Sequence, residues 1–232
     1  MRFKKLLLLV MLVAIIAAEP VLAQTNKIDK VNLLIIELVL EEGKGSIHVS
    51  VIPPQDDSMT NPDFKLLEYK WFTTAQYWIN PSNRYGLSDS SVVTTIVASA
   101  DLWDGHTSYV VFSYMGTTKS RAGKHDGYNV ISWGRYKRNI ISVTYFWYTG
   151  SQILETDTMM NTMYTWSLSG EAGKFDVQNI ITHELGHWCG LGDLTKDADY
   201  WLTMYASSAF GEIYKRTLGL GDILGVQAVY GL

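Results

Sequence analysis

Apolar residues recur with two different periods along the chain, and the period changes at defined places. Runs rich in β-branched and aromatic residues predict strands at 31–40, 46–52, 70–80, 109–115, 128–133, 140–148 and 153–160. Apolar positions spaced three and four apart predict helices at 88–103, 176–190 and 222–230. Strands interspersed with helices in this way indicate an α+β domain built on a mixed, twisted sheet.

The three predicted helices have recognisable ends. Ser88 or Asp89 is suited to cap the first, which is a long helix near the N-terminal end of the main domain. Asp176 is suited to cap the second helix. Gly190 is suited to end it, because glycine accepts the left-handed backbone conformation. The third helix closes the chain near Tyr230.

The first 23 residues have the pattern of a secretory signal peptide. Three basic residues among the first five precede an apolar run at 6–18, and small residues at 21–23 offer a cleavage site. The alternative is an uncleaved membrane anchor, for which this run is short against about 30 Å of hydrocarbon. We therefore expect an exported protein, either secreted or held at the cell surface.

Residues 24–65 carry no motif that decides their role. Two predicted strands are joined by the turn-like sequence 41–45 and followed by Pro53 and Pro54, which indicates a hairpin and a linker. Three interpretations stay open: a short propeptide, a hairpin added to the catalytic sheet, or a surface-attachment segment. The main domain is expected to span 66–232.

Composition is consistent with one compact domain. Of the 232 residues, 47% are hydrophobic and 18% charged, which is enough apolar material for one substantial core. Beyond the predicted signal peptide, 16 basic side chains stand against 22 acidic ones, a formal charge of −6. This balance argues against nucleic acid and anionic membranes as partners, and we expect a monomer. The single cysteine, Cys189, excludes an internal disulfide and is expected to pack in the core.

The stretch 182–193, Thr-His-Glu-Leu-Gly-His-Trp-Cys-Gly-Leu-Gly-Asp, has the spacing of a metal site. On a helix, His183 and His187 lie one turn apart and within about 40° of each other, so that both imidazoles can bind one ion. Glu184 points about 100° round the helix, where it can reach a water bound to that ion. The alternative is a solvated helix with two incidental histidines.

A catalytic zinc ion needs a third protein ligand, and Asp193 is the candidate. If the helix continued, Asp193 would lie about 9 Å beyond His187 along the axis. The chain must therefore break and fold back. Gly190 permits this break, and Gly192 adds further backbone freedom next to the ligand.

This stretch resembles the zinc-binding signature of the metzincin proteases, His-Glu-x-x-His-x-x-Gly-x-x-His/Asp, which a methionine-containing turn follows. Thr203-Met204-Tyr205 fits that turn, and 155–161 and 221–231 resemble the strand before the active-site helix and the closing helix of matrixins. The likeness covers about 70–232. It implies a zincin/metzincin-like catalytic domain with a mixed twisted sheet, a long N-terminal helix, an active-site helix, a Met-turn and a C-terminal helix.

The resemblance also assigns roles to residues. His183, His187 and Asp193 would bind one catalytic Zn²⁺. Glu184 would take a proton from the zinc-bound water, which attacks a peptide carbonyl, and would pass the proton to the leaving amine. Met204 would form a packed floor beneath the metal without binding it.

The main specificity pocket of the family has its wall just after the Met-turn. By resemblance, Tyr205, Ala206 and Ser207 fall at this wall.

Two departures from the matrixin pattern limit the comparison. Position 193 holds aspartate instead of the usual histidine, as in snapalysin-like prokaryotic metzincins. A carboxylate lowers the net charge of the site and weakens the metal as a Lewis acid, so Glu184 matters more. No cysteine precedes Cys189, which excludes the propeptide cysteine switch of the matrixins.

Other candidate sites have weaker signals. Asp104 with His106, and His125 with Asp126, have turn-like composition and could hold a second, structural zinc ion, but the fuller histidine pattern of the matrixin site is missing. Asp157 could join a calcium site or cap a turn. No motif supports calcium.

The leading hypothesis is a secreted zinc-dependent endopeptidase of the matrixin-like metzincin type, with a polypeptide substrate. The alternative is a catalytically silent, zinc-stabilised extracellular binding or surface module. A third interpretation is a zinc hydrolase that acts on a substrate other than a peptide.

Overall fold

A computed structural model of the chain describes residues 30–41 and 55–232, with the backbone alone at 55–57. The predicted signal peptide and the predicted strand at 46–52 lie outside the described residues. Among the helices that are described, none is long and apolar enough to cross a lipid bilayer.

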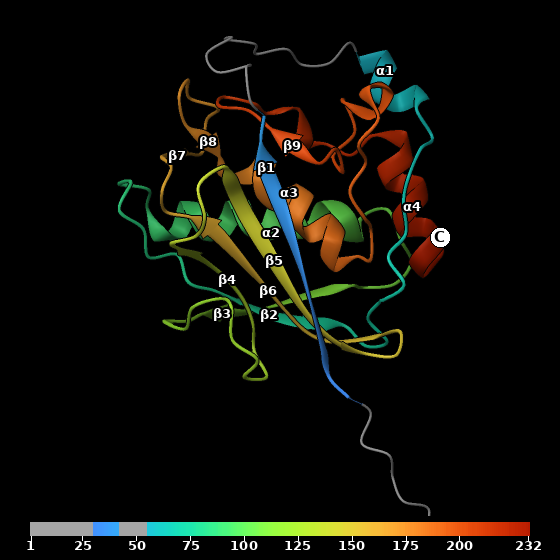
Figure 1. Cartoon of the computed structure of the whole chain (residues 1–232), viewed down its shortest axis with the longest axis horizontal. Helices are drawn as coiled ribbons and strands as arrows, with labels where there is room; N and C mark the ends of the chain where they lie inside the picture. The colour runs from blue at the N-terminus through green and yellow to red at the C-terminus, as the bar shows by residue number, and fades with distance from the viewer. Residues whose placement is uncertain (1–29, 42–54) are drawn as a thin grey trace, which may run out of the picture.

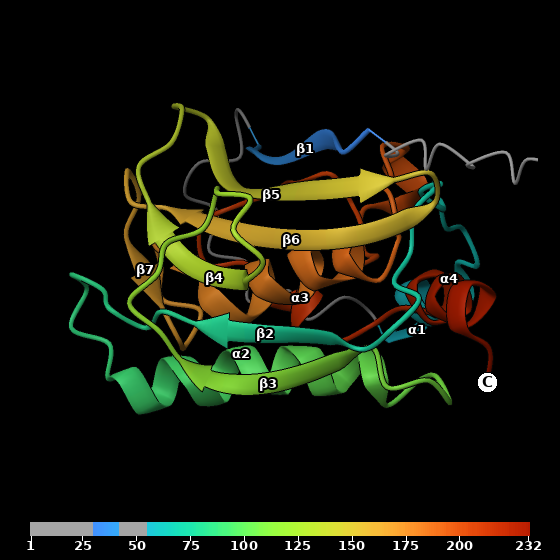
Figure 2. The same cartoon turned by 90° about the horizontal axis from the view of Figure 1, so that it is seen from below.

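Seven strands form one mixed, twisted sheet (Figure 1 and Figure 2). In spatial order they are β3 (Phe112–Thr117), β2 (Ala75–Ile79), β4 (Asn129–Gly134), β6 (Gln152–Asn161), β5 (Ile140–Thr149), β1 (Asn32–Leu40) and β9 (Ser207–Ser208). The first four run parallel, β5 is antiparallel to both of its neighbours, and β9 is parallel to β1. A separate pair of short parallel strands is formed by β7 (Trp166–Ser167) and β8 (Phe175–Asp176).

Four α-helices and two short 3₁₀ helices complete the described fold. They are α1 (Gln55–Thr60), α2 (Asp89–Asp104), α3 (Val177–Trp188), α4 (Leu220–Tyr230), η1 (Asp197–Asp199) and η2 (Tyr214–Arg216). Together with the mixed sheet they make a mixed α/β fold, as predicted at this level. The three helices predicted from apolar spacing are confirmed as α2, α3 and α4.

The prediction of a long N-terminal helix is wrong as stated. At the N-terminal end of the described residues lie β1 and the six-residue helix α1. The long helix is α2, with 16 residues, and it follows β2 because the helical spacing of apolar residues begins only there. Its cap is the predicted one, since the Ser88 side chain accepts from the backbone N–H of Ser91 at 3.1 Å.

Two strands differ from their predicted bounds. Strand β3 begins at Phe112, later than predicted, because the Asp104 carboxylate accepts from the backbone N–H groups of Val111 and Phe112 and holds the connection after α2 in a turn. Strand β2 begins late because Lys70 instead bridges to the start of β6, where its carbonyl accepts from the N–H of Ile153 at 2.9 Å.

Helices α2 and α3 pack on the same face of the sheet (Figure 2). Trp103 of α2 is fully buried, and its indole N–H donates to the carbonyl of Thr182 in α3 at 2.9 Å. Trp188, also fully buried, donates to the Thr158 hydroxyl on β6. These contacts fix the rotation of α3 against the sheet, so they also fix which face of α3 is turned towards β5.

Candidate metal centre

Helix α3 positions both histidines of the motif. Its first turn is capped by Asp176, whose side chain accepts from the backbone N–H of Asn179 at 3.0 Å. The guanidinium of Arg216 pairs with the same carboxylate and ties η2 to the start of the helix. His183 and His187 follow within the regular helix, with ring centroids 4.7 Å apart.

The predicted break after the helix is confirmed at Gly190. Its φ is +89°, and a Cβ there would lie 2.8 Å from the carbonyl oxygen of Tyr69, so only glycine fits without a shift. The Gly190 carbonyl accepts from Leu67, and Gly192 donates to the carbonyl of Lys65, both at 2.8 Å. These bonds hold the chain in the folded-back course that brings the next residue to the histidines.

The three predicted metal ligands converge. Asp193 Oδ1 lies 3.4 Å from His183 Nε2 and 3.5 Å from His187 Nε2, and the three ligand atoms all lie within 4.8 Å of one another. For metal–ligand bonds of about 2.1 Å, the edge of a coordination tetrahedron is about 3.4 Å. A nitrogen, nitrogen and oxygen donor set at this spacing fits a zinc ion with one position left open.

The two imidazoles are oriented by backbone carbonyls. His183 Nδ1 lies 2.7 Å from the oxygen of Thr203, and His187 Nδ1 lies 2.8 Å from the oxygen of Leu191. A carbonyl only accepts, so each Nδ1 carries the proton and each Nε2 presents a lone pair. Both Nε2 atoms and Asp193 Oδ1 are buried without a hydrogen-bond partner, an arrangement that a metal ion would satisfy.

Glu184 is held by strand β5. Its carboxylate accepts hydrogen bonds from the hydroxyls of Ser142 and Thr144, and Glu184 is 1% exposed. The Thr144 hydroxyl also bonds Thr158 at 2.6 Å, the residue that Trp188 anchors. The candidate base therefore has a fixed position next to the imidazoles instead of a mobile one in solvent.

Burial and charge set the protonation of these groups. Burial raises the pKa of Glu184, and the neighbouring His187 imidazole and the hydroxyls of Ser142 and Thr144 oppose this effect in part. Burial lowers the pKa of His187. Burial also pushes the pKa of Asp193 upward, but the neighbouring imidazoles outweigh it and hold that pKa below its usual range. A charged Asp193 beside a neutral His187 is the state in which both can bind a metal.

Met204 packs against the helix between the two histidines. It is 2% exposed, and a Cβ on Gly186 would lie 2.2 Å from its sulfur. The turn that carries it is held from behind by α4. The Asp222 carboxylate accepts from the N–H groups of Thr203, Met204 and Gly219 at 2.8, 3.1 and 2.8 Å. The predicted buried methionine turn is thus present as a packed structural unit.

The predicted pocket-wall residues follow this turn. Tyr205 bridges to Leu194, the residue after the third candidate ligand. Ala206 donates to the Leu194 carbonyl at 2.9 Å, and Ser207 begins strand β9. The predicted wall residues therefore lie next to Leu194, which follows the third candidate ligand.

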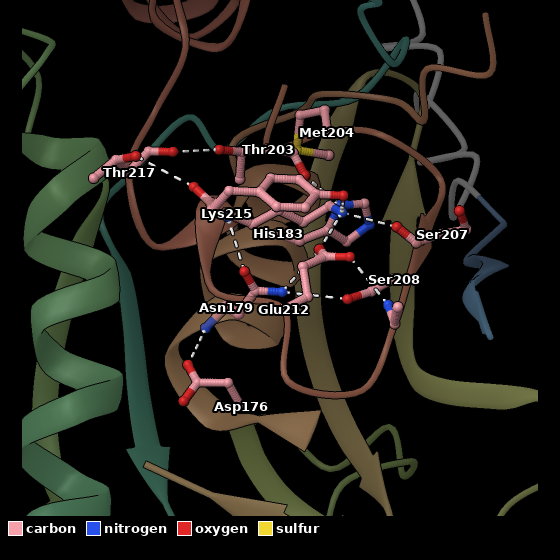
Figure 3. Close-up of polar contacts among 12 residues, drawn as sticks. Asp176, Asn179, His183, Thr203, Met204, Ser207, Ser208, Glu212, Lys215 and Thr217 are labelled. Atoms are coloured by element: carbon pink, nitrogen blue, oxygen red, sulfur yellow. Dashed lines mark hydrogen bonds and ion pairs between the residues drawn. The ribbon is translucent and has the colours of Figure 1, made fainter. Parts of the chain in front are cut away.

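A buried polar network lies behind this wall (Figure 3). Lys215 is fully buried, and its ammonium donates to the Ser207 carbonyl at 2.8 Å and to Glu212 at 2.6 Å. Asn179 of α3 donates to Glu212 and to the Ser208 hydroxyl. The network connects β9 and η2 to the helix that carries the histidines, so the wall and the ligands hold one relative position.

The weaker candidate sites have other roles. Asp157 accepts from the backbone N–H groups of Gly123, Lys124 and Val130, which caps the turns before β4. His125 stacks on Trp147 with ring centroids 5.4 Å apart. The Asp104 carboxylate is bonded to the start of β3, as described above. Cys189 is buried in the core, as predicted, and burial raises the pKa of its thiol well above the usual range.

Sequence reasoning missed four residues of the site. Ser142 and Thr144 alternate with apolar residues along a strand, and this inward polar pair in an apolar run was the available signal. The sequence pattern marks Asp222 only as the start of a helix, although its carboxylate anchors the methionine turn. Lys215 had no signal, because nothing local distinguishes a buried lysine from an exposed one.

The site is therefore a compact group of two histidines and one aspartate, with a glutamate beside them and a methionine beneath. Among the described residues, His183, His187 and Asp193 are the one group of three or more side chains arranged to hold a metal ion. When the chain is compared with protein-family models, none matches, and no curated protein matches it either.

Proposed function

We propose that the protein is a zinc-dependent endopeptidase of the matrixin-like metzincin type. One observation carries this proposal. The Nε2 atoms of His183 and His187 and the Oδ1 atom of Asp193 are buried without partners at distances that fit a tetrahedral zinc site. The sequence similarity to the metzincin signature supports the same assignment, including the predicted zincin-like arrangement of sheet, helix and methionine turn.

Each residue has a distinct role in peptide hydrolysis. A bound Zn²⁺ would supply Lewis acidity and an activated water. His183, His187 and Asp193 would hold the ion. Glu184 would accept the proton of the attacking water and deliver it to the leaving amine, so that no covalent intermediate with the protein is needed. The hydroxyls of Ser142 and Thr144 keep Glu184 in place for both transfers.

The remaining assignments rest on sequence. The substrate would be a polypeptide, with Tyr205, Ala206 and Ser207 lining the main specificity pocket. The signal-like residues 1–23 support export. One catalytic zinc ion is required by this scheme.

The proposal is tested by cleavage of an unfolded protein in the presence of zinc. We expect Glu184→Gln to lower the rate by about 100-fold or more at unchanged zinc occupancy, because it removes the base and leaves the ligands. Glu171→Gln is the matched control, since Glu171 is an exposed partner of Lys174 and should leave the rate unchanged. Equal rates in the Glu184→Gln and Glu171→Gln proteins would contradict the proposal.

One observation favours the alternative of a zinc-stabilised binding module. Both imidazoles and Glu184 are almost fully buried, as in a structural site. A module of this kind would bind one zinc ion per chain and cleave no polypeptide, even in variants that open the site.

A further inference from the structure

Strand β1 forms backbone hydrogen bonds with strand β5 on one side and strand β9 on the other, close to the candidate site. It pairs antiparallel with β5 from Asn32 to Val39, and Val39 and Leu40 pair parallel with β9 (Figure 1). Its backbone N–H groups alternate between the two neighbours: Val39 donates to Ala206, Leu40 to Asn139 and Glu41 to Ser208, at 3.4, 2.8 and 3.1 Å. An extended peptide held between two strands has this pattern of bonds.

The two neighbours of β1 are the elements that border the candidate metal centre. On β5, Ser142 and Thr144 donate to Glu184. Their register partners on β1 are Leu38 and Ile36. On the other side, β9 contains Ser207, one of the residues that we propose for the pocket wall after Met204. We call the space between 140–149 and 206–208 the peptide groove, and β1 lies along it.

Side chains of β1 alternate between the inside and solvent. Leu38 is 1% exposed and belongs to the main core cluster, whereas Val39 is 42% exposed. Leu34, Ile36 and Leu40 also pack against the core cluster. Leu38 is therefore a large aliphatic side chain buried opposite the residue that orients Glu184.

Without β1, strand β5 would be an edge with unpaired N–H and C=O groups along its length. Such an edge is a ready site for an extended peptide, which adds as a further strand and gains specificity from side chains in pockets. With β1 in place, this edge is paired from Asn32 to Val39, and Glu184, which is bonded to β5, is 1% exposed.

We propose that β1 is an internal occupant of the peptide groove. It lies where an extended substrate would lie, and it must leave before another polypeptide can bind. The groove then takes an extended chain with a leucine-sized side chain at the position of Leu38. This inference rests on the proposed function for its catalytic meaning, but the occupation of the groove can be tested by binding alone.

The face of β1 opposite to Leu38 is held by a polar clasp, which consists of Glu37, Tyr136 and Lys137. The Glu37 carboxylate accepts from the Tyr136 hydroxyl and from the Lys137 ammonium, both at 2.6 Å. Burial tends to raise the pKa of Glu37, but the bonds from Lys137 and Tyr136 outweigh it and lower that pKa overall. Leu38 and this clasp thus attach β1 at the two positions that pair with Ser142 and Val143, where β5 bonds Glu184.

The test uses the full chain with zinc and Glu184→Gln, so that no probe is cleaved. The probe is a fluorescein-labelled peptide with the sequence of 32–41, and its affinity is measured by anisotropy. Leu38→Asp places a charge in an apolar site and should expel β1, which raises probe affinity by about tenfold or more. Ile35→Asp is the matched control: Ile35 faces solvent on the same strand and should change the affinity by less than about twofold.

Hydrogen exchange in the same proteins reports whether β1 has left the groove. We expect faster exchange at Val39 and Leu40 in Leu38→Asp and unchanged exchange in Ile35→Asp. If Leu38→Asp does not fold, Leu38→Ala should give a smaller change in the same direction. Unchanged exchange in a folded Leu38 variant would overturn the inference, and so would faster exchange without tighter probe binding.

A second readout separates this inference from the proposed function. In chains that keep Glu184, Leu38→Asp should raise the rate of zinc-dependent cleavage of an unfolded protein by about tenfold. Tighter probe binding without any cleavage would contradict the endopeptidase and leave the groove assignment supported. A probe with aspartate at the position of Leu38 should bind none of the variants, and binding of this probe would overturn the assignment of the pocket.

Discussion

His183 Nδ1 lies 2.7 Å from the carbonyl oxygen of Thr203, the residue that precedes Met204 (Figure 3). This bond joins a candidate metal ligand to the methionine turn. The turn in turn depends on Asp222, which accepts from the N–H groups of Thr203 and Met204. A fully buried carboxylate on α4 thus fixes the orientation of an imidazole on α3 through one peptide unit.

We predict that Asp222→Asn weakens both the fold and the metal site. The amide keeps the shape but turns an NH₂ group towards backbone donors, which should cost about 2 kcal/mol in the free energy of unfolding. Because the carbonyl that orients His183 shifts, the zinc dissociation constant should rise by about tenfold. Urea denaturation and a competitive zinc titration measure the two effects. Asp197→Asn, at an exposed position, is the control, and equal zinc affinity in the two variants would contradict the coupling.

Zinc should stabilise the fold through the three ligands. A ligand that binds only the folded state at about 100 times its dissociation constant adds about 2.7 kcal/mol. We expect the zinc-induced rise in melting temperature to vanish in His187→Ala and to persist in His125→Ala, whose imidazole stacks on Trp147 away from the site. The comparison uses the shift on zinc addition because His187→Ala also lowers the stability of the metal-free protein. The same shift in both variants would contradict the assigned ligands.

Local pattern was sufficient to predict the core of the site. The spacing of His183 and His187, the cap at Asp176 and the glycine at 190 are all properties of one helix and its ends, and each is confirmed. Helices α2 and α4 were found for the same reason, since apolar spacing is a local signal. What the histidines face could not be derived, because it depends on how α3 rotates against the sheet.

Strand pairing between segments far apart in the chain could not be predicted from the sequence. The turn-like residues after β1 favour a hairpin with 46–52, a prediction that lies outside the described residues. No local signal indicates that β1 pairs with β5, about 100 residues further along the chain. Apolar strands of similar composition offer each other many acceptable partners, and only the assembled sheet selects one. Ser142 and Thr144 were missed for a related reason, since their role depends on a helix that begins more than 30 residues later.

The hydroxyls on β5 should support the base and leave metal binding unchanged. We expect Ser142→Ala to lower kcat by about tenfold with little change in KM, because the hydrogen bond acts on Glu184 and not on substrate. The measurement is made in the Leu38→Asp background with zinc loaded, where the groove should be open. Ser120→Ala, at an exposed position, is the control. A raised KM with unchanged kcat would assign Ser142 to substrate binding instead.

Gly186 and Met204 should be energetically coupled. A Cβ at 186 would lie 2.2 Å from the Met204 sulfur and 2.7 Å from a ring carbon of Trp103, so Gly186→Ala should destabilise the protein by about 1–3 kcal/mol. Met204→Ala removes the sulfur and should cost about 2–5 kcal/mol by itself. In the double variant the new methyl group gains room, and the combined loss should fall short of the sum by about 1 kcal/mol. Urea denaturation of the metal-free proteins checks this, and additive losses would show that Met204 does not pack on the helix at this point.

Asp157 should make stability depend on pH. Burial raises its pKa to about 7, although the N–H groups of Val130, Gly123 and Lys124 oppose the effect. The unfolded chain has the lower pKa, so the folded state holds the extra proton between about pH 4 and pH 7. The stabilisation from this proton is complete at low pH and is lost as pH rises through 7.

This carboxyl should therefore make the protein more stable at pH 5 than at pH 8, by about 2.6 kcal/mol as an upper value. Asp157→Asn cannot titrate and should lose that part of the difference, which urea denaturation at the two pH values measures. The control is Asp126→Asn, because Asp126 lies in the loop whose Gly123 and Lys124 N–H groups bond Asp157, is exposed and should leave the difference unchanged. If the pH dependence of Asp157→Asn matches that of the unaltered protein, the three N–H groups outweigh burial and Asp157 stays charged throughout this range.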